Sequence, residues 1–332
     1  MANALPLFPL GFFPTPLHEM KRLSKELGGP RLFIKRDDHT GLAMGGNKTR
    51  KLEFLIADAL RQGADTIITA GAAQSNHCRQ TAAAAACAGL RCELVLGGEP
   101  AGIPDGNLLL DHLLGASVHW TGVERRGERM EEIASLLRAR GRKPYLIPYG
   151  GSNGVGAAGY VAAMHELIGQ MKASGVMVDH IVVASSSGGT QAGLVLGAKL
   201  YGFSGSIVGV SIDKGERGTE TYEEEMAGIS NATARQLGLD ITCSPPDFTV
   251  RYNYLGSGYG IVSELEREAI HLTAHLEGLL LDPVYTGRAL GGMINMIRRR
   301  DLHEGSTVLF WHTGGTPALF AYGKDLVTVA TG

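Results

Sequence analysis

The sequence predicts an α/β fold built on parallel sheets. Short apolar runs such as residues 66–69 (TIIT) and 180–184 (HIVVA) alternate with longer segments that have a helical pattern of apolar residues. This alternation of strand and helix is typical of βαβ units, whose strands are parallel. The chain has 332 residues, enough for a large core, and 47 glycines, which favour tight turns between strands and helices. Ligands of such folds bind at the carboxyl ends of the strands, where the helices begin.

Each element follows from one of these two patterns. Leu52, Leu55 and Ile56 share one face of a helix over residues 50–62, and Gly63 is a typical helix stop. The expected strands are residues 31–35, 66–69, 91–96, 117–120, 144–147, 180–184, 206–211 and 307–311. The expected helices are residues 50–62, 76–88, 108–114, 129–140, 159–171, 193–200 and 264–279. The polar stretch 213–247 has no clear alternation, so we expect an irregular cover or an interface there.

Composition excludes several classes of partner. A formal net charge of -2 gives no electrostatic footprint for nucleic acid or an anionic membrane surface. No apolar run reaches the ~18 residues that a membrane span needs, and prolines interrupt an N-terminal stretch that lacks a basic region. The four cysteines form no CxxC and have no zinc-ligand spacing, so we expect buried reduced thiols and no metal. The expected protein is soluble and cytoplasmic.

A lysine follows two glycines and an asparagine in residues 45–53 (GGNKTRKLE). The glycines allow the backbone to turn tightly, which favours a constrained Lys48 over a solvated loop charge. Asn47 is suited to pinning this turn. Arg50 and Lys51 start the following helix, and we expect both to be ordinary surface charges.

Two other turns between strand and helix carry chemistry. Residues 185–193 (SSSGGTQAG) combine hydroxyls and glycines, which can wrap a phosphate with N–H and O–H groups. Ser75 and Asn76 lie at an expected helix start, where they are either a plain N-cap or part of an anion site. A third turn, residues 154–159 (GVGAAG), matches GxGxxG, but no acid follows at the end of the next strand, so we do not expect a dinucleotide site.

These features together favour pyridoxal 5'-phosphate (PLP). Hydroxyl groups accompany Lys48 and the phosphate turn, because Tyr259, Tyr285, Thr286 and Thr313 all lie in glycine-containing turns. The hydrolase motifs GxSxG and HExxH are absent. An amine beside a phosphate site is what a covalent aldehyde cofactor with a phosphate handle requires.

The motifs as a set resemble a known family over the whole chain. They are similar to the PLP enzymes of the tryptophan synthase β-like fold (fold type II), in the branch that holds D-cysteine desulfhydrase and 1-aminocyclopropane-1-carboxylate deaminase. The matching stretches, in family order, are residues 14–17 (PTPL), 34–38 (IKRDD), 45–54 (GGNKTRKLEF), 71–83 (GAAQSNHCRQTAA), 147–153 (IPYGGSN), 185–194 (SSSGGTQAGL), 281–289 (LDPVYTGRA) and 312–320 (HTGGTPALF). The resemblance implies two open twisted, mainly parallel sheets flanked by helices. It also implies a smaller domain of residues 46–156, a larger PLP-binding domain of residues 1–45 plus 157–332, and a homodimer.

The resemblance also implies a role for each candidate residue. Lys48 would form the Schiff base with the cofactor, with Asn47 beside it. The phosphate would be held by Ser187, Gly188, Gly189 and Thr190. Asn76 would bind the phenolic oxygen, and Ser75, Asn76 and His77 would approach the substrate carboxylate. Tyr259 and Tyr285 would flank the substrate, and Thr313 would lie beside the pyridine nitrogen with Thr286 close by. The expected catalytic residues are Lys48, Ser75, Tyr259 and Tyr285.

Three positions distinguish the reactions within the branch. This chain has Thr286, Thr313 and His77 where the deaminase pattern has Glu, Leu and Gln. A threonine hydroxyl can only hydrogen-bond the ring nitrogen, which leaves the ring a weaker electron sink than a carboxylate would. The expected reaction is therefore α,β-elimination, with freed Lys48 as the base.

The substrate remains a choice among four alternatives. D-cysteine, converted to pyruvate, hydrogen sulfide and ammonia, is the first expectation, although one sequence does not reveal the substrate's chirality. The second is L-cysteate, for which Arg288 and His77 are candidate sulfonate donors. A cyclopropane deaminase and a non-catalytic small-molecule binding protein complete the set.

Overall fold

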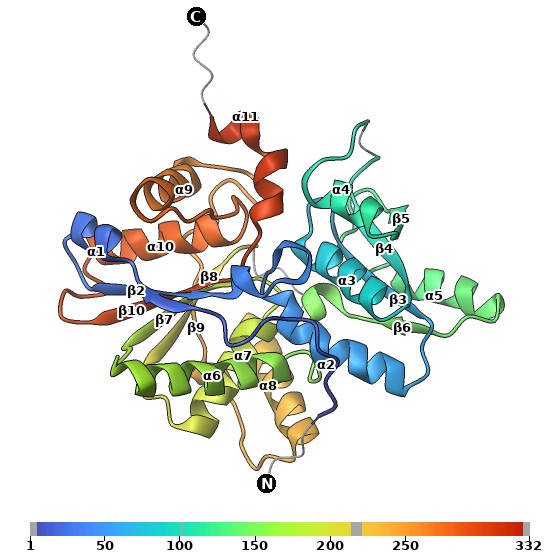
Figure 1. The fold of residues 1–332 in the computed structure, drawn as a ribbon, viewed down its shortest axis with the longest axis horizontal. Coiled ribbons are helices and arrows are strands. Elements are labelled where there is room, and N and C mark those ends of the chain that lie inside the picture. The colour runs from blue at the N-terminus through green and yellow to red at the C-terminus, as the bar shows by residue number, and fades with distance from the viewer. Residues whose placement is uncertain (1–4, 101, 214–220, 328–332) are drawn as a thin grey trace, which may run out of the picture.

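Two mainly parallel sheets form the frame of the molecule (Figure 1). The structure is a computed structural model that describes residues 5–100, 102–213 and 221–327. The larger sheet has six strands in the order β1 (Leu17–Glu19), β2 (Arg31–Arg36), β10 (Thr307–His312), β7 (His180–Ser185), β8 (Ser206–Ser211) and β9 (Thr249–Arg251). The smaller sheet has four, in the order β5 (Ser117–Trp120), β4 (Arg91–Gly97), β3 (Thr66–Ala72) and β6 (Pro144–Leu146). All neighbouring strands are parallel except β1, which is antiparallel to β2.

Helices cover both faces of each sheet. Along β7, Val182 packs toward α1 (Lys21–Leu27), α9 (Glu264–Glu277) and α10 (Thr286–Arg298), whereas Ile181 and Val183 pack toward α6 (Ala158–Ser174), α7 (Gly189–Tyr201) and α8 (Tyr222–Leu237). This division follows from the alternation of side chains along a strand. One face of the smaller sheet packs on α2 (Lys48–Arg61), α3 (Asn76–Cys87) and α4 (Gly106–Leu113), and the other face packs on α5 (Met130–Ala139). The last helix is α11 (Gly323–Leu326).

The predicted fold class and all eight predicted strands are confirmed, with every start as predicted and the last residues within three positions of the prediction. Four helices (α2, α4, α6 and α7) begin earlier than expected, and two of them carry predicted site residues. α2 begins at Lys48 rather than residue 50, and α7 begins at Gly189 rather than residue 193. The predicted amine and the predicted phosphate turn therefore lie at helix N-termini, where backbone N–H groups are unpaired.

The sequence analysis missed β1, α1, α8, β9, α10 and α11. α8 lies in the stretch 213–247 that was expected to be irregular, and residues 214–220 of that stretch lie outside the described residues. α10 contains Gly287 and Gly291, which disfavour a helix by propensity. A Cβ on Gly291 would lie 2.7 Å from Leu265 Cγ, so this glycine allows α9 to pack closely on α10.

The GxGxxG stretch has a packing role. A Cβ on Gly156 would lie 2.2 Å from Gly151 O, and one on Gly159 would lie 2.2 Å from Arg50 O. Gly159 therefore allows the start of α6 to lie against α2, and Gly156 allows the turn before α6 to lie against Gly151.

Other sequence expectations have mixed outcomes. Three cysteines are buried as expected, but Cys87 is exposed at the end of α3, and all four are free thiols. None of the helices in the described ranges is long and apolar enough to cross a membrane. The strands of the smaller sheet all lie within residues 46–156 and those of the larger sheet all lie outside them. The division into two domains at these boundaries stays a prediction.

Candidate active site

A cavity lies where the N-termini of α2, α3 and α7 meet. Its lining residues are Asn47, Lys48, Ser75, Asn76, His77, Tyr149, Gly150, Ala184, Ser185, Ser186, Ser187, Gly188, Thr190, Gln191, Tyr285 and Thr313. Of the predicted site residues, only Gly189, Tyr259 and Thr286 are outside this lining. Segments that are far apart in the sequence thus converge on one site.

Lys48 is the first residue of α2 and lines the cavity. The loop before it has positive φ angles at Gly45 (71°) and Gly46 (130°), as the GGNK motif suggested. A Cβ on Gly314 would lie only 2.6 Å from Gly46 Cα, so the two double-glycine motifs touch backbone to backbone. Burial lowers the pKa of Lys48 to about 8. About a tenth of this amine is therefore neutral, and nucleophilic, at pH 7, far more than for an ordinary lysine.

Asn47 fixes the position of Lys48 relative to its surroundings. Its backbone N–H donates to Thr313 O at 2.9 Å, and its Nδ2 donates to Thr190 Oγ1 at 3.1 Å. The first bond connects the loop before Lys48 to the end of β10. The second ties it to the phosphate turn at the start of α7.

The phosphate turn is completed by a residue that the sequence analysis did not include. Ser187 Oγ lies 2.7 Å from Ser152 Oγ, and the Gly189 N–H donates to the same Ser152 Oγ at 3.1 Å. Lys51 Nζ donates to Ser152 Oγ and to Gly150 O, both at 3.1 Å. A cation therefore lies directly behind the turn.

Lys51 is not the surface charge that was expected. Its side chain is fully buried, and burial, together with nearby Lys48, lowers its pKa well below the ordinary value. No ion pair joins it to a carboxylate of the described residues. A buried ammonium group of this kind needs a counter-charge.

The residues present therefore fit PLP. Lys48 offers the amine for its aldehyde. Ser187, Thr190 and the first N–H groups of α7 offer donors for its phosphate, and Lys51 offers the positive charge that a phosphate dianion balances.

The comparisons with known proteins agree with this fit. A family model described as "Pyridoxal-phosphate dependent enzyme" matches residues 9–314. This chain belongs to the family of PLP-dependent enzymes. It is 45% identical over 320 residues to a D-cysteine desulfhydrase of Klebsiella pneumoniae, covering 94% of this chain and 95% of the relative. It is also 45% identical over 315 residues to a D-cysteine desulfhydrase of Yersinia enterocolitica, with 93% of each chain covered. A crystal structure of a homologue of 1-aminocyclopropane-1-carboxylate (ACC) deaminase superposes with a TM-score of 0.88 at 38% identity, covering 97% of this chain and 95% of the other.

The N-terminus of α3 presents donors to the cavity of this PLP-dependent enzyme. Ser75 is the N-cap, and its Oγ accepts the Cys78 N–H at 3.2 Å, which leaves its hydroxyl hydrogen free to donate. Asn76 Oδ1 accepts from Asn107 Nδ2 at 2.8 Å, so the amide orientation leaves Asn76 Nδ2 as a donor. Serine and asparagine are thus more than a plain cap here.

His77 is held as a neutral acceptor. Thr69 Oγ1 donates to Ile147 O at 2.9 Å, so at its 2.8 Å contact with His77 Nε2 it must accept. His77 Nδ1 is then unprotonated, and it is buried without a partner in the described residues. Burial, together with Lys48 and Lys51, lowers the pKa of His77 well below the ordinary value. The expectation that His77 is a candidate donor to a sulfonate is therefore not supported.

Arg288, the other candidate sulfonate donor, points away from the cavity. It is fully buried, and its Nε donates to Glu266 Oε1 at 2.5 Å. Its Nη1 donates to Ile212 O at 2.9 Å, and its Nη2 donates to Gly258 O at 3.0 Å. These bonds brace the loop that carries Tyr259.

The two predicted tyrosines form a pair. Tyr285, the N-cap residue of α10, lines the cavity, and its Oη lies 2.6 Å from Tyr259 Oη. The rings meet edge to face, with centroids 6.0 Å apart. Tyr259 therefore supports Tyr285 from outside the cavity wall.

Thr313 and Thr286 differ in position. Thr313 lines the cavity. Thr286 Oγ1 donates to Asp282 Oδ1 at 2.7 Å and accepts the Asp282 N–H at 2.8 Å. Its hydroxyl is already used in both directions, so of the two threonines Thr313 is the one available to a ligand.

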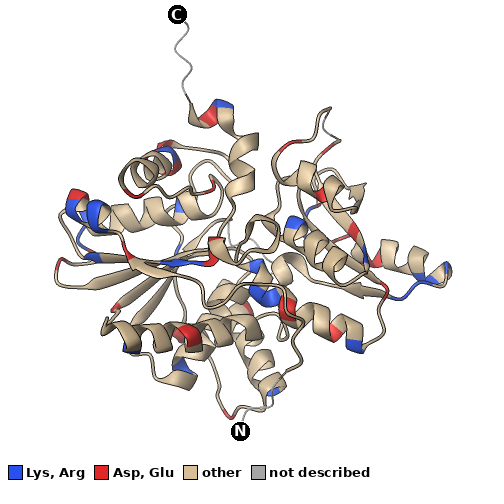
Figure 2. Cartoon of the chain, viewed as in Figure 1, with Lys and Arg blue, Asp and Glu red and all other residues tan. Residues whose placement is uncertain are grey.

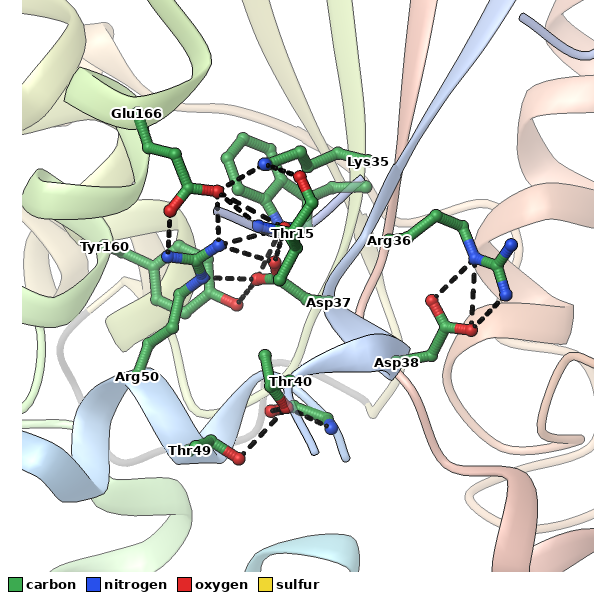
Figure 3. A network of polar contacts seen from close by, with 12 residues as sticks. Thr15, Lys35, Arg36, Asp37, Asp38, Thr40, Thr49, Arg50, Tyr160 and Glu166 are labelled. Atoms are coloured by element: carbon green, nitrogen blue, oxygen red, sulfur yellow. Dashed lines mark hydrogen bonds and ion pairs between the residues drawn. The ribbon is translucent and has the colours of Figure 1, made fainter. Parts of the chain in front are cut away.

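Arg50 was also expected at the surface and is instead buried in an ion network (Figure 3). Its Nε and Nη2 each donate to Asp37 at 2.9 Å, and its Nη1 and Nη2 donate to Glu166 at 3.0 and 2.9 Å. Lys35 pairs with Glu166 as well, which balances the charges of the network. Figure 2 shows this concentration of lysine and arginine at the start of α2, between the two sheets. The first turn of the helix that carries Lys48 is thereby fixed to the turn that follows β2 and to α6.

Proposed function

We propose that this enzyme catalyses α,β-elimination from D-cysteine to give pyruvate, hydrogen sulfide and ammonia. One observation carries the choice of elimination: among the residues that the structure describes, no aspartate or glutamate lines the cavity, and Thr313 does. A neutral hydroxyl beside the ring nitrogen favours elimination, because the leaving group itself accepts the electrons. The relatives named D-cysteine desulfhydrase support the same substrate.

Bound PLP supplies an electron sink for the bonds broken at the substrate's α-carbon. Lys48, with a pKa of about 8, is the base that takes the α-proton. Ser187, Gly188, Gly189 and Thr190 would hold the phosphate together with Lys51, and Asn76 Nδ2 would be a donor for the phenolic oxygen. Ser75 Oγ and the N-terminus of α3 bind the substrate carboxylate, since a helix N-terminus favours an anion.

The site favours a thiol over a sulfonate as the leaving group. A sulfonate would need additional cations or donors at the β-position. Arg288 is bound to Glu266 and to backbone carbonyls, and His77 presents a lone pair. L-cysteate is therefore the second candidate substrate, behind D-cysteine.

The predicted homodimer, the cytoplasmic location, and the domain ranges 46–156 and 1–45 plus 157–332 belong to this proposal as well. They rest on the resemblance of the motifs and stay predictions.

Pyruvate release from D-cysteine, L-cysteine, L-cysteate and β-chloro-D-alanine tests the proposal, alongside ammonia release from the cyclopropane acid. We expect turnover of D-cysteine and β-chloro-D-alanine. Lys48→Ala should abolish turnover and the visible absorbance of bound PLP, whereas the exposed Lys143→Ala should change neither. Turnover of L-cysteate alone, or of the cyclopropane acid alone, would refute D-cysteine as the substrate. A protein that turns over none of these compounds would be a binding protein.

A further inference from the structure

Arg125 joins the two halves of the molecule beside the tyrosine pair. It lies in the loop between β5 and α5, and its Cζ lies 3.8 Å from the centroid of the Tyr259 ring. Its Nη1 donates to Tyr149 Oη at 3.4 Å. Gly97 makes this approach possible, because a Cβ there would lie 2.5 Å from Arg125 Cβ.

The tyrosine pair lies between two cavities. Tyr285 lines the central cavity, and Tyr259 lines a second one that it shares with Arg125 and Asp213. The hydroxyl contact of 2.6 Å connects the two sides. The pair is therefore placed to carry a proton from the solvent side to the substrate.

The guanidinium determines which hydroxyl donates. A cation over the face of Tyr259 stabilises negative charge on that ring. Burial raises the pKa of Tyr259 well above the ordinary value, while the bond with Tyr285 and the charge of Arg125 oppose this rise. For Tyr285, burial, Tyr259 and Tyr149 all raise the pKa. Tyr149 and Asp213 raise the pKa of both tyrosines, so they do not distinguish them.

The cation over the Tyr259 ring favours the arrangement in which the Tyr259 O–H donates to Tyr285 Oη. The O–H of Tyr285 is then free to point into the cavity that Tyr285 lines.

We infer that Arg125 is a positioning residue that makes the pair of Tyr259 and Tyr285 a proton relay to the departing sulfur. The inference rests on the proposed elimination. As the Cβ–S bond breaks, its electron pair leaves with the sulfur, and Tyr285 Oη gives the sulfur a proton. Tyr285 takes the proton of Tyr259 in turn. The negative charge comes to rest on Tyr259, beneath the guanidinium, until water returns the proton.

Two substrates with different leaving groups test the relay. Hydrosulfide leaves faster when it is protonated, whereas chloride needs no proton. We expect Arg125→Gln to lower kcat on D-cysteine by about 10-fold or more, a part of the roughly 100-fold or larger effect of a general acid, and to leave kcat on β-chloro-D-alanine within about 2-fold. Tyr259→Phe should show the same selectivity, and Arg125→Lys, which keeps a cation over the ring, should restore most of the lost rate.

Arg126→Gln is the matched control. Arg126 lies in the same loop and pairs with Asp213 at 2.9 Å, so its loss perturbs the loop without removing the cation over Tyr259. It should leave the ratio of the two rates unchanged. Equal losses on both substrates in Arg125→Gln and Tyr259→Phe, or no loss on either, would overturn the relay while the elimination stands. Failure of the wild-type enzyme on D-cysteine would overturn the proposed function and the relay with it.

Discussion

At Lys51 a buried ammonium group contacts a hydroxyl and a carbonyl but, in the described part of the chain, no carboxylate. The helical spacing of the sequence indicates that Lys51 is buried. Lys51 follows Lys48 by three residues and precedes Leu55 by four, so it shares the apolar face of α2. Lys48 and the serine turn were recognisable because glycines flank them. Lys51 was not, because a charged residue early in a helix usually faces solvent.

Replacing Lys51 with methionine should weaken PLP binding. The change keeps the length of the side chain and removes the charge that balances the phosphate. We expect about a 10- to 100-fold rise in the dissociation constant, equivalent to about 1.4–2.7 kcal/mol. Titration of the apoenzyme with PLP, followed by visible absorbance, measures it. Lys143→Met, at an exposed position, is the control, and an unchanged affinity in Lys51→Met would contradict the assignment of the phosphate site.

At the scale of the element, α2 is positioned by long-range polar contacts rather than by its own sequence. Arg50 bonds Asp37 and Glu166, which lie 13 and 116 residues away. Tyr160 Oη and Trp311 Nε1 also donate to Asp37 Oδ2, at 2.6 and 2.8 Å. The helical pattern predicted α2 itself, but no local pattern identifies partners this distant. The same limit applies to α10, whose glycines are explained only by the packing of α9.

Asp37→Asn should destabilise the protein by about 3 kcal/mol at neutral pH, because it leaves part of the charge of Arg50 unpaired in a buried site. Burial alone would raise the pKa of Asp37, but Arg50 and Lys35 hold it below the ordinary value. The ion pair therefore contributes fully above the ordinary carboxyl pKa of about 4 and is lost as the pH falls through the lower folded value. Urea unfolding at pH 7 and at lower pH measures this difference, which should shrink on acidification. A difference in stability between Asp37→Asn and the wild type that does not change with pH, or no difference at pH 7, would contradict the role of the ion pair between Asp37 and Arg50. Glu131→Gln, at an exposed ion pair, should change stability by less than about 1 kcal/mol.

At the scale of the whole molecule, the two sheets and their helices direct three helix N-termini and Lys48 at one cavity, with Lys51 behind the phosphate turn. The sequence predicted the sheets well, because strand alternation is a local property. The convergence of these segments on one site could be predicted only from the order of the motifs. The contacts that Arg125 and Arg50 make between the two halves of the molecule could not be predicted from the sequence. The charged form of Lys51 pairs with no carboxylate of the described chain, and the phosphate of the cofactor would supply its counter-charge.

Removal of PLP should therefore lower the thermal stability of the whole protein. A ligand that binds only the folded state at 100 times its dissociation constant adds about 2.7 kcal/mol, which corresponds to roughly 5 °C in Tm for a chain of this size. Calorimetry of the apoenzyme with and without PLP measures the shift. Pyridoxal, which keeps the aldehyde and lacks the phosphate, is the matched control. It can react with Lys48 but leaves Lys51 and the N-terminus of α7 without a counter-charge, so it should raise Tm by much less at the same concentration. If pyridoxal and PLP raised Tm equally, the stabilisation would come from Lys48 alone, and the serine turn with Lys51 would not be the phosphate site.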